Sequence, residues 1–324
     1  MFFSCGYREN LRPLNKKFHP DQKMIDRLPA WFKQDLPTQH SLSQLHFLSS
    51  LKLNTVCREA KCPNLSECFN KSQLTFLILG DTCTRNCRFC NVRKSAAKKL
   101  AVDFDEPQRL ASAVDKLKLN YVIITSVTRD DLGDAGAGIF ARAIESIHAV
   151  QKEIKVELLI PDLRGRISSL ESILAAGPEV IGHNIETVRR LYPKLRPQAN
   201  YDLSIKLLAN IKKINPAIVT KSSIMLGFAE KEQEVINTMR DLRSAGCDIL
   251  TLGQYLAPTK KHYPVKEFIS PDKFREYQKI GLDLEFKAVV SGPLVRSSYR
   301  AQEVYNSLKT MNFSVLSTQL ITNH

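Results

Sequence analysis

Six of the eight cysteines in this 324-residue chain fall into two groups of three. The groups are Cys57, Cys62 and Cys68 in CREAKCPNLSEC, and Cys83, Cys87 and Cys90 in CTRNCRFC. Dense disulfide frameworks belong to small secreted domains, and nothing in this sequence signals secretion. The grouping therefore favours metal binding. The remaining cysteines, Cys5 and Cys247, are interpreted as a bystander and a buried small hydrophobe.

The second group follows directly after an apolar run, in LTFLILGDTC. Three thiolates on a short loop can hold three irons of a 4Fe-4S cluster and leave the fourth iron open to a ligand. A structural zinc site is the alternative, but it requires four ligands and commonly uses paired CxxC motifs. The CxxxCxxC spacing, with Phe89 just before the last cysteine, resembles the signature of radical S-adenosylmethionine (SAM) enzymes. The resemblance implies that SAM chelates the open iron and is cleaved to methionine and a 5′-deoxyadenosyl radical.

The first group also provides three thiolates, so a fourth ligand must come from elsewhere. CREAKCPNLSEC followed by CTRNCRFC, together with Arg296-Ser297-Ser298-Tyr299 near the C-terminus, resembles lipoyl synthases. The resemblance implies an auxiliary 4Fe-4S cluster held by the three cysteines and one serine, which we assign to Ser298 rather than Ser297. A hard alkoxide is a poor ligand for iron beside soft thiolates, which suits a cluster that is taken apart to supply sulfur. Alternatively, either serine caps a helix over 299–308.

Apolar or β-branched runs alternate with amphipathic stretches from residue 74 onward. They predict six strands, at 74–79, 121–125, 156–160, 180–184, 218–225 and 249–253. Apolar residues between them recur with helical spacing, as at Leu110, Val114 and Leu117 and at Val235, Met239 and Leu242. This pattern predicts an α/β fold with a parallel sheet covered by helices, either a barrel or a doubly wound sheet. About six βα units favour a partial or full TIM-like (β/α) barrel, whose chemistry lies in the loops after the strands.

With the family resemblance, the expected organisation has four parts. An N-terminal extension (1–40) precedes the auxiliary-cluster cysteine loop (41–72), the radical SAM barrel (73–292) and a C-terminal extension with the RSSY motif (293–324). The two extensions are expected to carry the auxiliary cluster.

Other segments carry the resemblance from about residue 28 to about residue 300, including YVIITSVTRDDLGDAG, HNIETVRRLYPKLRPQANYD and LTLGQYLAPTKKHYPV. By position these are strand-end loops, where Asn184, Glu186 and Arg196 could bind the polar groups of SAM. An ordinary surface role is the alternative for each of them. One segment departs from the family: MLGFAEKEQEV keeps an acid at Glu230 but replaces a flexible pair by Phe228-Ala229, which predicts a local difference in backbone approach to SAM.

Composition and charge limit the class of protein. The chain is 43% hydrophobic and 25% charged, which is typical of globular proteins, and no apolar run approaches the ~18 residues of a membrane span. We therefore expect no membrane role and a cytoplasmic location in a bacterium, with an organellar location left open. The net charge of +14 implies an acidic partner, although a generally basic solvated surface is the simpler interpretation.

The resemblance implies two sulfur insertions, at C6 and C8 of an octanoyl-lysine. The expected substrates are lipoyl carrier domains of 2-oxo acid dehydrogenase E2 and of the glycine cleavage carrier protein, with flavodoxin or ferredoxin as electron donor. Lipoyl domains are commonly acidic, so the net charge of +14 would attract them to this protein.

Three alternatives stay open from the sequence. A biotin-synthase-like enzyme would lack the first cysteine group and RSSY, whereas a two-cluster enzyme that modifies RNA would share the general layout. A zinc-stabilised nucleic-acid-binding protein would not explain the alternation of strands and helices, and no recognition motif for nucleic acid is visible. No nucleic acid is therefore expected as a partner.

Overall fold

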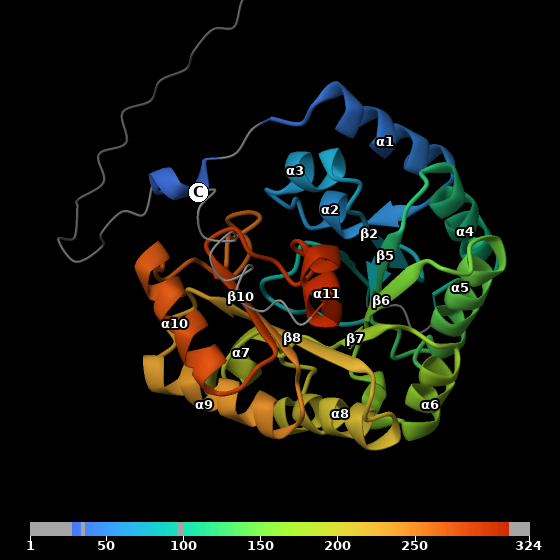
Figure 1. Cartoon of the computed structure of the whole chain (residues 1–324). Helices are drawn as coiled ribbons and strands as arrows, with labels where there is room; N and C mark the ends of the chain where they lie inside the picture. The colour runs from blue at the N-terminus through green and yellow to red at the C-terminus, as the bar shows by residue number, and fades with distance from the viewer. Residues whose placement is uncertain (1–27, 34–35, 96–99, 311–324) are drawn as a thin grey trace, which may run out of the picture.

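Seven parallel strands form a curved sheet with helices on its outer face (Figure 1). The computed structural model describes residues 28–33, 36–95 and 100–310. The strands pair in the order β1-β2-β5-β6-β7-β8-β9-β10, and only the short β1 (Asn54–Thr55) runs antiparallel to its neighbour. The parallel strands are β2 (Thr75–Ile78), β5 (Tyr121–Ser126), β6 (Lys155–Leu159), β7 (Val180–Gly182), β8 (Val219–Leu226), β9 (Ile249–Gln254) and β10 (Ala288–Gly292). In this part of the chain β1 and β10 do not pair, so the barrel is partial.

Helices connect the successive parallel strands and cover the sheet. They are α4 (Glu106–Lys116), α5 (Ala137–Val150), α6 (Ile167–Ala175), α8 (Tyr201–Ile214), α9 (Glu232–Ser244) and α10 (Pro271–Asp283). Six helical crossovers between seven strands agree with the predicted α/β architecture of about six βα units. The six predicted strands correspond to β2 and β5 to β9, whereas β10 was not predicted.

Burial explains why the pattern could be read from the sequence. Every residue of β9 is buried, as are the first five of β5, so both faces of these strands are covered and their sequences are mostly apolar. On α9 the predicted apolar positions Val235, Met239 and Leu242 all face the core. The core therefore lies between the sheet and its ring of helices.

Short elements before the barrel carry the first cysteine group. They are η1 (Ala30–Phe32), α1 (Gln39–Ser50), α2 (Val56–Glu59) and α3 (Leu65–Asn70). The side chain of Thr38 accepts a hydrogen bond from the Ser41 amide at the start of α1 and donates one to Asn70 at the end of α3. This cap fixes α1 against α3.

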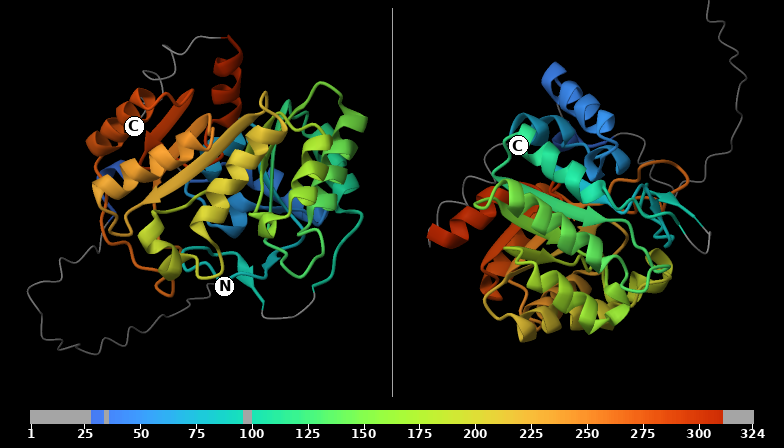
Figure 2. Two further views of the ribbon diagram at one scale, coloured as in Figure 1. Left: turned by 90° about the horizontal axis from the view of Figure 1, so that it is seen from below. Right: turned by 90° about the vertical axis from the view of Figure 1, so that its right-hand side faces the viewer.

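Helix α11 (Ala301–Thr310) covers the amino ends of the strands. Tyr305 packs against Tyr121, the first residue of β5, with ring centroids 5.8 Å apart, and Ala301 joins the same apolar cluster. Figure 1 looks along the barrel and shows α11 in front of its centre. Figure 2 shows α11 at one end of the barrel and the small pair β3 (Thr82–Cys83) and β4 (Arg93–Lys94) at the other.

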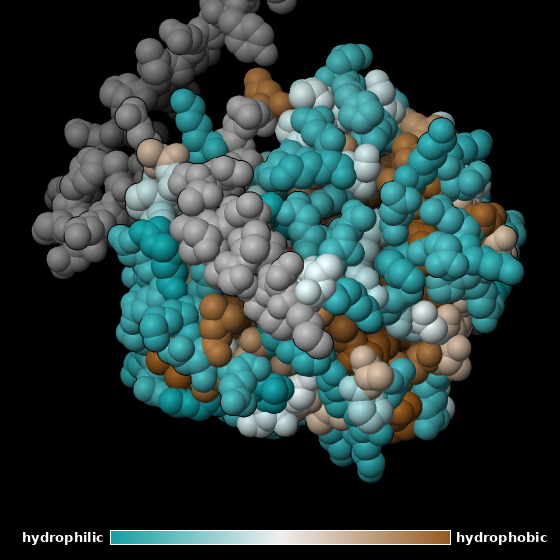
Figure 3. All heavy atoms as spheres, in the orientation of Figure 1, coloured by the Kyte–Doolittle hydropathy of each residue, from teal (hydrophilic) through white to brown (hydrophobic). Residues whose placement is uncertain are grey.

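The surface seen in Figure 3 is largely hydrophilic, with separate apolar patches between the charged side chains. Within the described ranges, none of the helices combines the length and apolarity that crossing a membrane requires.

Candidate metal centre

The second cysteine group lies on the loop that follows β2, at the carboxyl ends of the strands. Backbone hydrogen bonds join this loop to three other strand-end segments. The Thr84 amide donates to Thr128 O after β5 at 3.0 Å, and the Arg88 amide donates to Leu195 O after β7 at 2.9 Å. The Tyr263 amide, after β9, donates to Arg88 O at 2.9 Å. The cysteine loop is therefore braced from several sides of the barrel.

Arg85 adds a buried ionic clamp to this loop. Its guanidinium makes paired hydrogen bonds of 2.5 and 2.7 Å to Asp162 and of 2.7 and 2.9 Å to Asp130. Asp130 follows β5 and Asp162 follows β6, so one side chain connects three strand ends. Bidentate pairing fixes direction as well as distance. This clamp was not predicted from the sequence, although Arg85 lies between Cys83 and Cys87 and both aspartates follow strands.

Burial governs the chemistry of these thiols. It raises the pKa of Cys90 to about 12 and also raises the pKa of Cys87. The charge of Arg196 acts against this rise at Cys87, and the Arg85 amide donates to the Cys83 sulfur at 3.4 Å. A metal must displace the thiol protons when it binds, so loading is coupled to proton release.

The three predicted SAM contacts come together beside the cysteine loop. Asn184 follows β7 and donates to the Glu186 carboxylate at 3.2 Å. The Arg196 guanidinium donates to Asn184 O at 3.1 Å and to the Tyr192 hydroxyl at 2.8 Å. Burial raises the pKa of Glu186, and the charge of Arg196 opposes this shift. The three residues thus form one polar group, with Arg196 buried and Asn184 and Glu186 half-buried, and the charges of Arg196 and Glu186 act on Cys87.

Several buried polar atoms here have no partner in the part of the chain that the structure describes. They are Asn184 Oδ1, Arg196 Nε, His183 Nε2, Thr187 Oγ1 and Ser126 Oγ. Buried polar atoms without partners are costly, so such a set indicates a place for a polar ligand. Carboxylate, ammonium and hydroxyl groups of the kind that SAM carries match these donors and acceptors. Ser126, His183 and Thr187 were not predicted as site residues, although Ser126 ends β5 and the other two follow β7.

The departure from the family at Phe228-Ala229 has a packing explanation. Phe228 is fully buried and stacks on Tyr255 with ring centroids 4.2 Å apart, and Phe89 of the cysteine loop lies 6.1 Å from it. Ala229 adopts a positive φ of 72°. Glu230 accepts hydrogen bonds of 3.0 Å from the amides of residues 227 and 228, and burial raises its pKa to about 7. The replacement therefore builds an aromatic support behind the cysteine loop.

The first cysteine group surrounds a small pocket near the start of β2. The pocket is lined by Cys57, Cys62, Cys68 and Ser298, together with Arg296, Tyr299 and neighbours that include Thr75 of β2. Ser297 is not among the residues that line it. Burial raises the pKa of Cys57 to about 12 and raises that of Cys68 as well.

Two contacts bring the RSSY segment to these cysteines across more than 200 residues of sequence. Asn64 Nδ2 donates to Leu294 O at 2.6 Å, and the Tyr299 hydroxyl donates to Glu67 at 3.1 Å. The predicted helix over 299–308 begins two residues late, at Ala301, so Arg300 rather than either serine directly precedes it. The helix-cap alternative for the serines is therefore wrong.

Within residues 28–33, 36–95 and 100–310, no three His, Cys, Asp or Glu side chains converge closely enough to hold a single metal ion. In a 4Fe-4S cluster each protein ligand binds a different iron, and the irons occupy alternate corners of a cube, so the ligands need not converge on one point. Cys247 is buried beside β9, where its thiol donates to Ile249 O at 3.3 Å, and Cys5 lies outside the described residues.

Comparison with known proteins places this geometry in a family. Residues 77–242 match the model of the Radical SAM superfamily. The lipoyl synthase of Thermus thermophilus is 50% identical over 284 residues, which cover 87% of this chain and 88% of that protein. The lipoyl synthase of Caldicellulosiruptor saccharolyticus is 48% identical over 281 residues, 86% of this chain and 98% of that protein. The chain belongs to the lipoyl synthase family.

Membership of the lipoyl synthase family confirms the predicted enzyme class. The chain is a radical SAM enzyme, and its family implies a 4Fe-4S cluster and SAM as cofactors.

Solved structures agree on the fold. The FeFe-hydrogenase maturase HydG matches with a TM-score of 0.54 and 12% identity, over 72% of this chain and 54% of that one. Methylornithine synthase matches with a TM-score of 0.50 and 14% identity, over 74% and 81%. At these identities the likeness shows only that this chain shares its fold with these proteins.

Proposed function

We propose that this enzyme inserts sulfur at C6 and C8 of an octanoyl group attached to a lysine of a lipoyl carrier domain. The observation that carries the proposal is the pocket that joins Cys57, Cys62, Cys68 and Ser298, which is separate from the cysteine loop after β2. Two ligand sets in one lipoyl synthase family member are what a radical generator and a separate sulfur source require.

The residues have distinct tasks in this proposal. Cys83, Cys87 and Cys90 hold the SAM cluster, and Asn184, Glu186 and Arg196 orient the polar groups of SAM. Cys57, Cys62, Cys68 and Ser298 hold an auxiliary 4Fe-4S cluster. When bound, these groups supply a 5′-deoxyadenosyl radical and sulfur, so the hard chemistry is that of the cofactors.

The chain positions and shields this chemistry. Arg85 and the braced loop hold the second cysteine group, whereas Asn64 and Tyr299 hold the RSSY segment against the first. Helix α11 covers the amino end of the barrel and limits the access of water from that side. No side chain needs to act as a general base to begin a hydrogen abstraction.

The finer assignments of partner and place follow from the family. We propose octanoylated E2 and glycine cleavage carrier domains as substrates, a flavodoxin or ferredoxin as electron donor and a cytoplasmic location, as expected for relatives that are bacterial. The 1–40 and 293–324 extensions and the 41–72 loop are proposed to build the auxiliary site around the 73–292 barrel.

Metal analysis tests the two-cluster proposal directly. Iron, acid-labile sulfide and Mössbauer spectra are measured on anaerobically reconstituted parent protein and on two triple variants, Cys83→Ala/Cys87→Ala/Cys90→Ala and Cys57→Ala/Cys62→Ala/Cys68→Ala. We expect about eight irons in the parent and about four in each variant. Zinc in place of iron, or about four irons in the parent, would reject two clusters.

A further inference from the structure

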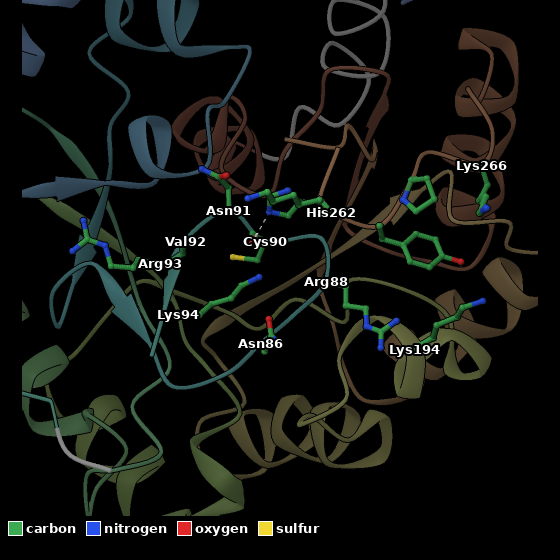
Figure 4. Close-up of a pocket in the computed structure, with 13 residues that line it drawn as sticks. Asn86, Arg88, Cys90, Asn91, Val92, Arg93, Lys94, Lys194, His262 and Lys266 are labelled. Carbon is green, nitrogen blue, oxygen red and sulfur yellow. Dashed lines mark hydrogen bonds between the residues drawn. The ribbon is translucent and has the colours of Figure 1, made fainter. Parts of the chain in front are cut away.

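A pocket of about 1070 Å³ opens beside Cys90 (Figure 4). No acidic residue lines it, and six cationic residues do: Arg88, Arg93, Lys94, Lys194, Lys261 and Lys266. They come from the cysteine loop and β4, from the segment after β7 and from the segment after β9. Figure 4 labels five of them, all except Lys261, around Cys90 and His262. The fold therefore gathers positive charge from three distant parts of the sequence at this one place.

Most of this charge is uncompensated. Of the six side chains, Arg93 alone forms an ion pair with a carboxylate of the described residues, at 3.3 Å from Asp81. Lys194 and Lys266 lie 5.7 and 5.9 Å from the ring of Tyr263. A concave surface with charges of one sign raises the rate at which an oppositely charged partner associates.

The pocket reaches the cysteine loop directly. Cys90 lines it, and the ring nitrogen Nε2 of His262 lies 3.2 Å from Cys90 O. The Tyr263 amide binds Arg88 O, so the pocket wall and the loop form one hydrogen-bonded unit. None of the proposed SAM contacts Asn184, Glu186 and Arg196 lines the pocket. The pocket is thus a second approach to the proposed cluster, distinct from the SAM site.

We propose that this basic pocket is the docking surface for a small acidic one-electron carrier protein. The inference rests on the proposed function, because radical formation consumes one electron. In the transfer, the carrier loses one electron and the cluster held by Cys83, Cys87 and Cys90 gains it. The route is short because a ligand of that cluster forms part of the pocket wall.

Exposure and position separate this partner from other anions. The volume is at the upper end of the ~300–1000 Å³ usual for small-molecule sites, and exposed lysines and arginines rather than buried donors supply the charge. An octanoylated lysine must reach between both cysteine groups, whereas this pocket contacts only the second group. An acidic protein that only delivers electrons fits both facts.

The test uses the full-length reconstituted enzyme and a charge-reversal pair, Lys261→Glu/Lys266→Glu. Lys116→Glu/Lys213→Glu is the matched control, because it changes the net charge equally at exposed lysines near the amino ends of the strands. Two quantities are measured for each protein: the Kd of oxidised flavodoxin, and the anaerobic rate of cluster reduction by reduced flavodoxin. Reduced methyl viologen, a small cation that needs no docking surface, serves as the second reductant.

We expect the Lys261→Glu/Lys266→Glu enzyme to bind flavodoxin at least about tenfold more weakly and to be reduced by it at least about tenfold more slowly. Its reduction by methyl viologen, and all values for the control enzyme, should stay within about twofold of the parent. Unchanged flavodoxin binding and reduction would overturn the proposal, as would weaker binding of an octanoylated lipoyl domain in place of flavodoxin. Neither measurement depends on the formation of lipoyl product. A failure of the docking proposal can therefore be distinguished from a failure of the proposed function, which is tested by product formation.

Discussion

Ser297 and Ser298 share a residue type and a similar partial exposure, yet only Ser298 lines the pocket of the first cysteine group. If Ser298 is an iron ligand, Ser298→Ala should lower lipoyl formation by at least about tenfold, because even outer-shell changes at metal sites have effects of this size. Cleavage of SAM to 5′-deoxyadenosine should continue. Product and 5′-deoxyadenosine are quantified together in a carrier assay. Equal losses in the control Ser297→Ala would contradict the assignment.

Glu230 should make stability depend on pH. Its carboxyl group has a pKa raised to about 7 by burial, against an ordinary value of 4.5. Between these values the folded chain keeps a proton that the unfolded chain releases, so stability is lost as pH rises through this window, on the order of 3 kcal/mol in total. Glu230→Gln keeps an acceptor for the two amides but has no proton to release.

The measurement for Glu230 is urea unfolding of parent and Glu230→Gln at about pH 5 and pH 8. The free energy of unfolding of the parent should fall relative to that of the variant between the two conditions. A difference that does not change with pH would show that Glu230 is ionised throughout.

At the scale of elements, Arg85 should decide whether the cysteine loop keeps its shape. Arg85→Met leaves the Asp162 carboxylate buried without its partner, a change that costs about 3–5 kcal/mol. We expect a lower thermal midpoint and the loss of about half of the bound iron. Arg129→Met is the control, because Arg129 forms a buried pair with Asp131 and holds residues 100 and 101 rather than the cysteine loop. Equal iron loss in both variants would mean that general destabilisation is the cause.

Local patterns account for what could be predicted from the sequence. Alternation of short apolar or β-branched runs with helical stripes predicted β2 and β5 to β9, because most residues of those strands are buried on both faces. The strand β10 was not predicted, because its sequence AVVSG is short and ends in polar or small residues. The cysteine groups were visible from spacing alone. Two features of the site depend on contacts between distant segments, which no local pattern encodes. One is the pairing of Arg85 with Asp130 and Asp162. The other is the set of buried polar atoms without partners on Ser126, His183 and Thr187.

At the scale of the whole molecule, the net charge of +14 should make association with an acidic lipoyl domain depend on salt. Between about 0.1 M and 1 M salt the Debye length falls from ~10 Å to ~3 Å, so the Kd should rise by at least about tenfold. The Kd is measured by titration of octanoylated lipoyl domain at several salt concentrations. A Kd that does not change with salt would show that the net charge does not contribute to binding of the lipoyl domain.

Strand β2 links the two cysteine groups. The pocket of the first group is lined by Gln73 and Thr75, and Cys83, the first cysteine of the second group, lies five residues after β2 ends at Ile78. A strand rises about 3.3 Å per residue, so β2 acts as a spacer of roughly 13 Å that cannot flex as a loop does. Insertion of one residue would turn its side chains to the opposite faces of the sheet. The separation of the two cysteine groups is therefore set by the sheet, and under the proposed two-cluster function a substrate chain must be long enough to span it.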